Sequence, residues 1–427
     1  MSLKRNLKWS SVGTISRYLF QTASIVILAR LLTPEDFGVV SASMLVVNFL
    51  IVIAQLGGCQ AIVVSDNDKY NERLFHVSFF CIITSIIFLL MVNLLAEPIS
   101  KFVSSRDISL YIKLSSLLII PKALSVIFEG VLIRNSDFKY LAFSNIVTYI
   151  FLYFTVAVLL SWMDFGAISI IIASLVQGIG FFLFLFFRCI KMYDIKPKMV
   201  IDNVKESLSI ALSISMTQLV SNVTSQVDNL VVSRYLGLDV LGVYTRAYQL
   251  VVVPCNLIGQ IINRAYLHYF SSKGASEEKI LILRKSLFTN FVLSLSISTI
   301  FTIFGQYIVL FLLGDGWEEI TIPLSILSMT IFPRMLYKIS EPVLYSLGKS
   351  KVLAVYSMVY FILVCSSAIF LVRYGMLGVA FSVLIGTSCY GFLSFSKVVS
   401  EYQMLKKEMI LYSVGYFISS FCVFLYV

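Results

Sequence analysis

Long apolar runs, separated by short polar segments, recur along the entire chain. Each run has about 20 residues or more, the length at which an α-helix spans the hydrocarbon core of a bilayer. Regular alternation of apolar and polar positions is absent from these runs, which argues against a transmembrane barrel. We therefore predict an all-α polytopic membrane protein with twelve core helices and a shorter thirteenth. The predicted spans are residues 10–30, 37–64, 74–96, 108–133, 139–162, 165–188, 206–233, 240–263, 286–313, 320–346, 351–372, 376–397 and 409 to the end.

Polar positions inside the first predicted span recur 204 residues later inside the seventh. The first set is Thr14, Arg17, Gln21 and Ser24, and the second is Gln218, Ser221, Ser225 and Asp228. The segments that follow also match, Arg30–Val39 in the first half and Arg234–Val243 in the second. Another match, between Pro121–Val147 and Pro333–Val359, pairs a Pro, a Glu and a Lys that apolar bias does not explain. The chain is therefore an internal duplication.

Each copy of the repeat contains six predicted spans. Because six is even, both copies cross the membrane in the same orientation, which makes the repeat parallel. We predict an N-terminal lobe at residues 1–190, a cytoplasmic linker at 191–205, a C-terminal lobe at 206–400 and an extra helix at 401–427. Two lobes with polar-faced helices predict a hydrated cavity between them, an arrangement typical of transporters.

Composition agrees with a membrane protein: 59% of the 427 residues are hydrophobic, 13% are charged and the mean hydropathy is +0.91. The net charge of +10 raises the question of a nucleic-acid partner. Most Lys and Arg residues, however, fall in alternate loops, the positive-inside pattern that sets membrane topology. We expect a cytoplasmic N-terminus and no nucleic-acid binding. The seven cysteines have no CxxC spacing, so we predict no metal site.

Polar residues follow one face of three predicted helices at helical spacing. On the first helix they include Arg17 and Gln21, and on the seventh they include Asp228. On the eighth they are Arg246, Gln249, Asn256 and Gln260. Interhelical hydrogen bonds, worth roughly 0.6 kcal/mol each, are one explanation. Binding of a substrate in a cavity is the other.

Positive charges at mid-span favour the cavity. An Arg or Asp at the centre of a span costs at least ~2.5–3.5 kcal/mol, so such residues normally face a partner or water. Arg17 and Arg246 have no acidic neighbour on their own helices. Lys122 and Arg334 are equivalent in the repeat, and each directly follows a Pro. Because Arg donates charge-assisted hydrogen bonds to phosphate and diphosphate, we predict that these four cations bind an anionic substrate.

The acidic residues within the spans leave alternatives open. Asp228 could titrate or hold a sodium ion and so couple transport to an ion gradient. Alternatively, it could pair with Arg17 or Arg246 across the lobes. For Glu129, Glu341 and Lys338 a structural role is favoured. Lys338 and Glu341 are three residues apart on one helix and can neutralise each other.

Three segments carry a resemblance to a known family: Ala29–Val39, Asp228–Tyr244 and Leu313–Trp317. Together they resemble the polysaccharide flippases of the multidrug/oligosaccharidyl-lipid/polysaccharide (MOP) superfamily, most closely those for O-antigen, capsule or colanic-acid repeat units. The similarity extends over nearly the whole chain. The chain differs in having one predicted helix after the twelfth, where relatives often have two.

The resemblance implies two six-helix lobes around a hydrophilic cavity lined by the first, second, seventh and eighth helices. It also implies a bacterial inner-membrane protein that moves an undecaprenyl-diphosphate-linked oligosaccharide from the cytoplasmic to the periplasmic leaflet. The expected partners are that lipid, the bilayer and, as a candidate, a polysaccharide polymerase. We expect a monomer without a cofactor, driven by H⁺ or Na⁺ rather than by ATP.

Two other classes remain open at this stage. A drug/cation antiporter of the same superfamily would share the lobes but favour acidic residues in its cavity, whereas mid-span cations outnumber acids in this chain. A polysaccharide polymerase or ligase would also have about a dozen spans but usually needs a large periplasmic loop. The longest predicted periplasmic connection, around residues 97–107, has roughly a dozen residues, so we expect a transporter rather than an enzyme.

Overall fold

The computed structural model describes residues 3–63, 65, 70–104, 106–192, 204, 215, 219, 222–271, 276–402 and 406–426. These residues form helices and connecting turns, without a strand among them. Most of the predicted linker at 191–205 lies outside the described residues, as do Gln218 and Ser221 of the repeated polar set. The predicted all-α class is confirmed.

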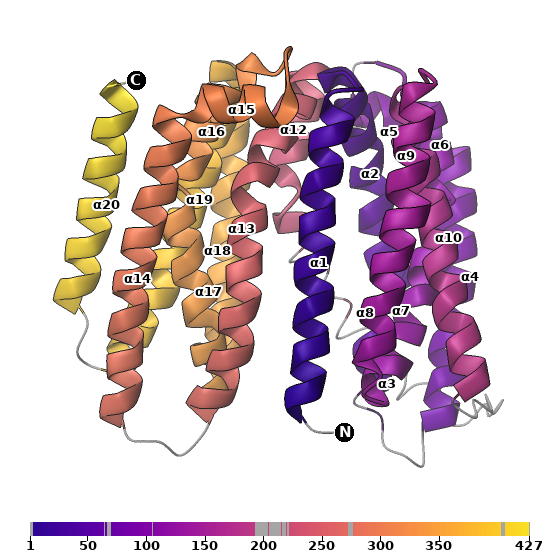
Figure 1. Ribbon diagram of the computed structural model, residues 1–427, viewed down its shortest axis with the longest axis horizontal. Helices are drawn as coiled ribbons and strands as arrows, with labels where there is room; N and C mark the ends of the chain where they lie inside the picture. Colours follow the sequence, from indigo (N-terminus) through magenta and orange to yellow (C-terminus); the bar gives the residue numbers. More distant parts are fainter. Residues whose placement is uncertain are drawn as a thin grey trace. The chain divides into compact units, whose positions relative to one another are not determined.

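The chain divides into two compact units. Unit 1 comprises Met1–Gln226 together with Gly237–Gly242, and unit 2 comprises Val227–Leu236 together with Val243–Val427. The helices of unit 1 (Figure 1) are α1 (Leu3–Ala29), α2 (Pro34–Ala54), α3 (Gly58–Val63), α4 (Tyr70–Leu94), α5 (Ala96–Val103), α6 (Ser109–Ser116), α7 (Ile119–Arg134), α8 (Phe138–Val147), the π-helix η1 (Thr148–Phe154), α9 (Thr155–Trp162) and α10 (Ala167–Met192).

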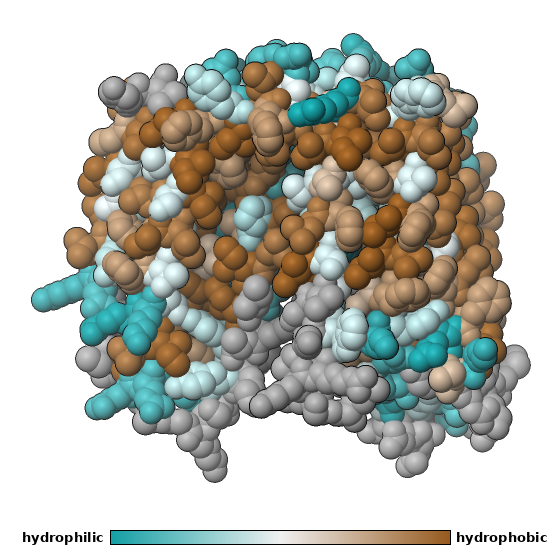
Figure 2. Space-filling view, viewed as in Figure 1, coloured by the Kyte–Doolittle hydropathy of each residue, from teal (hydrophilic) through white to brown (hydrophobic). Residues whose placement is uncertain are grey.

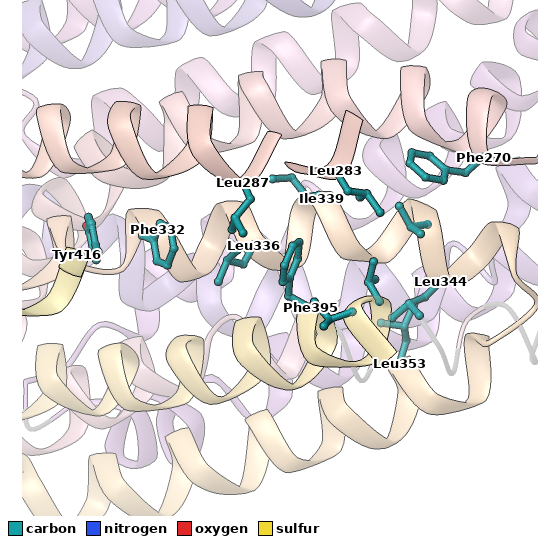
Figure 3. Close-up of a cluster of buried hydrophobic side chains, with 13 residues drawn as sticks. Phe270, Leu283, Leu287, Phe332, Leu336, Ile339, Leu344, Leu353, Phe395 and Tyr416 are labelled. Atoms are coloured by element: carbon teal, nitrogen blue, oxygen red, sulfur yellow. The ribbon is translucent and has the colours of Figure 1, made fainter. Parts of the chain in front are cut away.

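Unit 2 contains α12 (Val227–Tyr235), most of α13 (Leu238–Ser271), α14 (Ser276–Ile303), α15 (Gly305–Leu313), the short helix η2 (Glu318–Ile320), α16 (Thr321–Ser328), α17 (Ile331–Ser346), α18 (Ser350–Leu371), η3 (Val372–Tyr374), α19 (Gly375–Tyr402) and α20 (Lys406–Tyr426). Its core is a cluster of buried apolar side chains from α13, α14, α17, α18, α19 and α20, shown in Figure 3. Phe332 and Phe395 are among its fully buried members.

The segment between the first two helices shows how the sequence determines a helix start. Thr33 caps α2, because its hydroxyl accepts the Asp36 amide at 3.3 Å while the Asp36 carboxylate accepts the Thr33 amide at 3.0 Å. Pro34 occupies the first turn, where its missing amide hydrogen costs nothing. The other oxygen of Asp36 accepts the amide of Ala167 at 2.8 Å and so ties the start of α2 to the start of α10.

The first turn of α13, Gly237–Gly242, belongs to unit 1 and touches α2 backbone to backbone. A Cβ on Gly38 would overlap the carbonyl oxygen of Leu238, and a Cβ on Gly242 would overlap that of Pro34. These two contacts are related by the repeat. Arg106 forms ion pairs with Glu35 and with Asp239, which is the repeat equivalent of Glu35. The distance from the Arg106 guanidinium nitrogen to the Asp239 carboxylate oxygen is 3.8 Å.

Eight helices in the described part of the chain are long and apolar enough to span a membrane, or nine if the bent pair α16 and α17 is one span. The helices that fail this test include α1 and α13, which carry the polar faces; in α1 only Ile15–Ala29 is apolar. On the face shown in Figure 2, hydrophobic residues cover the middle of the helices and hydrophilic residues gather toward their ends. The chain is a multi-pass membrane protein, and the count of twelve plus one stays a prediction.

The C-terminal helix α20 is part of the core of unit 2. It packs against α14 (Figure 1), and Tyr416 is fully buried. The Tyr416 ring stacks on Phe332 with centroids 4.8 Å apart, and its hydroxyl donates to the Ser328 carbonyl at 3.2 Å. This helix therefore stabilises unit 2 rather than only anchoring the chain end.

Tyr416→Ala is expected to destabilise the protein by about 3–5 kcal/mol, the range for removing a buried aromatic side chain. The measurement is thermal unfolding of the purified protein in detergent. Phe421→Ala, on the same helix but 52% exposed, is the control and is expected to change the unfolding temperature little. Equal shifts for the two variants would contradict a core role for α20.

Candidate functional site

Arg17 and Gln21 lie one turn apart on α1, with Arg17 exposed and Gln21 half-buried. The helix is held against α8, where Gly13 approaches Ala142 so closely that an added Cβ would be 2.7 Å from the Ala142 Cβ. Arg17 interacts electrostatically with two α7 side chains, Lys122 and Glu129. The structure thus brings two of the predicted cations, Arg17 and Lys122, within electrostatic range of each other in unit 1.

A cavity of 390 Å³ lies in unit 1 beside this charged group. Its lining residues are Val52, Gln55, Cys59, Gln60, Val126, Glu129 and Asn222. A break in the second span shapes it: Leu56 and Gly57 both have left-handed backbone, with φ of 48° and 56°, so α2 ends and α3 begins there. A non-glycine residue with positive φ is strained, and such strain concentrates at functional sites.

Unit 2 presents the polar side of α13. Arg246 is 8% exposed, and Gln249, Asn256 and Gln260 are half-buried. The side-chain oxygen of Gln249 is buried and accepts no hydrogen bond from the described residues. An unsatisfied buried carbonyl costs about 1–3 kcal/mol, so a ligand or water that donates to it would be bound favourably.

Asp228 on α12 is 3% exposed and accepts a hydrogen bond from the Tyr244 hydroxyl at 2.8 Å. Arg334 on α17 is 5% exposed; it donates to Thr330 Oγ1 at 2.9 Å and to the Tyr248 hydroxyl at 3.0 Å. Its guanidinium also lies 4.9 Å from the Tyr248 ring centroid, within cation–π range. Asp228 and Arg334 interact electrostatically within this buried network.

The two members of the repeated Glu pair have different surroundings. Glu341 on α17 accepts the Tyr390 hydroxyl at 2.8 Å and lies near Lys338. Glu129 on α7 lines the unit 1 cavity, and it makes no hydrogen bond or ion pair with another described residue. A structural role fits Glu341, while Glu129 is placed to meet a ligand. Among the described residues, no group of His, Cys, Asp or Glu could hold a metal ion.

A family model described as "Polysaccharide biosynthesis protein" matches residues 27–322, more than half of the chain. The chain belongs to the polysaccharide biosynthesis protein family. This family member is 24% identical over 261 residues to the succinoglycan biosynthesis transport protein ExoT of Rhizobium meliloti, covering 60% of this chain and 51% of ExoT. It is 24% identical over 278 residues to the lipopolysaccharide biosynthesis protein WzxC of Escherichia coli, covering 64% and 55%. The chain thus spans about half the length of these curated relatives.

Solved structures show which fold the polysaccharide biosynthesis protein has. The lipid II flippase MurJ in an inward closed conformation matches with a TM-score of 0.76 at 16% identity, covering 97% of each chain. An inward-facing multidrug transporter of the MATE family and MOP superfamily matches with a TM-score of 0.71 at 15% identity, covering 93% of this chain and 99% of that one. The fold is that of these MOP-superfamily transporters, so the fold and the polysaccharide biosynthesis family that the sequence resemblance implied are confirmed.

Several residues of this polysaccharide biosynthesis protein were missed by sequence reasoning. The cavity residues Gln55 and Gln60 flank a Gly pair, Gly57 and Gly58, within an apolar run. Two amides beside a helix-breaking Gly pair were the available signal. Tyr244 and Tyr248 were overlooked because a single tyrosine within a span resembles an ordinary packing residue.

Proposed function

We propose that this protein is a flippase that moves an undecaprenyl-diphosphate-linked oligosaccharide from the cytoplasmic to the periplasmic leaflet of the bacterial inner membrane by alternating access. The observation that carries the proposal is the cationic group of Arg17 and Lys122 beside a polar cavity in unit 1. Two cations within a membrane span are costly unless they serve an anion or face water. A diphosphate can accept charge-assisted hydrogen bonds from both cations.

The mechanism separates the two parts of the substrate by solvent. The lipid tail stays in hydrocarbon while the diphosphate and sugars travel along polar side chains, which avoids moving charge through the apolar core. Arg17, Lys122 and Arg246 attract the diphosphate. Hydrogen bonds to sugar hydroxyls come from the amides of Gln21, Gln249, Asn256 and Gln260.

The buried network of unit 2 supplies the ion coupling in this proposal. Asp228 carries the coupling proton or sodium ion, and its occupancy changes the electrostatic balance with Arg334. Arg334, predicted to bind substrate, acts in this proposal on the anionic cargo through the conformation of unit 2, because hydrogen bonds to Thr330 and Tyr248 hold its guanidinium in the buried network.

Arg17→Ala is expected to reduce surface polysaccharide to less than about a tenth of wild type when it complements a flippase-deletion strain, because a lost charge-assisted bond to a desolvated anion slows transport strongly. Polymer is quantified at equal membrane abundance. Arg373→Ala is the control: Arg373 is exposed and stacks on Phe370 and Tyr374, and its loss is expected to leave polymer unchanged. Full activity of Arg17→Ala would overturn the proposal.

A further inference from the structure

The unit 1 cavity has a lining that suits a sugar. Two glutamines, an asparagine and a carboxylate meet the space, from Gln55, Gln60, Asn222 and Glu129. Amides can donate and accept, and an ionised carboxylate accepts hydrogen bonds from hydroxyls at both of its oxygens. Among the described residues, the cavity lining includes no cation, which distinguishes it from the neighbouring Arg17 and Lys122 that are proposed to bind the diphosphate.

The cavity is built by the backbone and is not a chance gap between side chains. The left-handed residues Leu56 and Gly57 turn the chain between α2 and α3, which puts Gln55 before the break and Gln60 after it. From the other side, α7 approaches so closely that a Cβ on Gly130 would be 2.9 Å from the Cα of Cys59. This backbone contact fixes Glu129, the preceding residue, at the cavity wall.

Glu129 differs from its repeat equivalent in its hydrogen-bond partners. Its repeat equivalent Glu341 is bonded to Tyr390, whereas the described residues provide no such donor to Glu129. Arg17 acts on Glu129 electrostatically but forms no ion pair with it within 4 Å. The carboxylate is therefore available to a ligand whose phosphate is held by Arg17.

We infer that this cavity is the subsite for the sugar attached directly to the diphosphate, and that Glu129 selects a neutral or amino sugar there. The inference rests on the proposed function, since it needs the diphosphate at Arg17 and Lys122. A neutral sugar donates hydroxyl hydrogens to Glu129 and exchanges hydrogen bonds with Gln55 and Gln60. A uronic acid at the same position would bring a second carboxylate against Glu129, and two like charges a few ångströms apart repel each other.

The test is direct binding to the full-length protein in lipid nanodiscs at pH 8. Three probes are used: farnesyl diphosphate, farnesyl diphosphate carrying galactose, and farnesyl diphosphate carrying galacturonic acid. We expect wild type to bind the galactose probe at least about tenfold more tightly than the galacturonic acid probe. Glu129→Gln is expected to bring the two affinities within about threefold of each other, mainly by improving binding of the acidic probe.

Two further variants complete the experiment. Glu341→Gln, the matched change at the repeat-equivalent site, is expected to keep the wild-type preference. Gln60→Leu is expected to weaken binding of the galactose probe about fivefold, since one net hydrogen bond is worth about 1 kcal/mol. Binding of farnesyl diphosphate is expected to stay unchanged.

The outcomes separate the two proposals. If wild type and Arg17→Ala bind farnesyl diphosphate equally, or neither binds it, the diphosphate site of the proposed function is wrong. The flippase proposal stands if farnesyl diphosphate binds and Arg17→Ala weakens that binding. The sugar subsite is nevertheless wrong if wild type binds the two sugar probes equally, or if Glu129→Gln keeps the wild-type preference.

Discussion

Arg334→Met is expected to lower the unfolding temperature of the detergent-purified protein by about 10 °C. The substitution removes a buried cation that interacts with Asp228 and bonds to Thr330 and Tyr248. Its loss leaves the buried hydroxyl oxygens of Thr330 and Tyr248 without their donor, at about 1–3 kcal/mol each, and leaves Asp228 without the nearby cation. For a unit of about 200 residues, each kcal/mol corresponds to roughly 2–4 °C.

A double-mutant cycle distinguishes this electrostatic effect from simple loss of packing. Asp228→Asn combined with Arg334→Met is expected to recover at least about half of the lost stability, since no uncompensated charge remains. Arg373→Met, which replaces an exposed arginine, is expected to leave the unfolding temperature within about 1 °C of wild type. Additive losses in the double variant would show that Arg334 and Asp228 are not coupled.

Gly38→Val is the second substitution for which we expect a large effect, at least about 3 kcal/mol and a low yield of folded protein. The Gly38 Cα faces the carbonyl oxygen of Leu238, and a backbone atom cannot rotate away as a side chain could. Overpacking a rigid contact typically costs about 1–3 kcal/mol, and a branched side chain at a backbone contact belongs at or above the upper end.

Gly242→Val tests the repeat-related half of the same crossing, where the obstructing atom is the Pro34 carbonyl oxygen, and is expected to give a similar loss. Gly415→Ala serves as the control, because its Cβ would meet only Phe291 at an ordinary 3.6 Å and alanine favours a helix. Both losses are measured by thermal unfolding, with Gly38→Ala as a milder variant if Gly38→Val does not accumulate. A wild-type unfolding temperature for Gly38→Ala and Gly242→Val would contradict the backbone contact.

The sequence contained enough information for the fold class and for the polar helices. Apolar runs of span length predict membrane helices on physical grounds, and charges such as Arg17 and Arg246 within them are too costly to be incidental. The cap at Thr33 could also be anticipated, since a Thr-Pro-Glu-Asp segment contains its own hydrogen-bond partners. In each case the determining interaction is local or depends on the membrane alone.

The divergence between the repeats could not be predicted in this way. Lys122 and Arg334 occupy equivalent positions, yet Lys122 is half-buried near Arg17 while Arg334 is enclosed by Thr330 and Tyr248. Burial depends on neighbours from other helices, and the repeat match does not specify them. The same reason explains why Tyr244 was not identified as the partner of Asp228: the two residues lie on different helices.

The paired left-handed residues at Leu56 and Gly57 have a mechanical consequence. They divide one span into two helices, α2 and α3, and the angle between these helices depends on a few backbone torsions. Gln55 caps the C-terminal end of α2, and Gln60 lies in α3. A ligand that forms hydrogen bonds with both amides restricts the angle between α2 and α3. Substrate binding and the choice of this angle are then thermodynamically coupled.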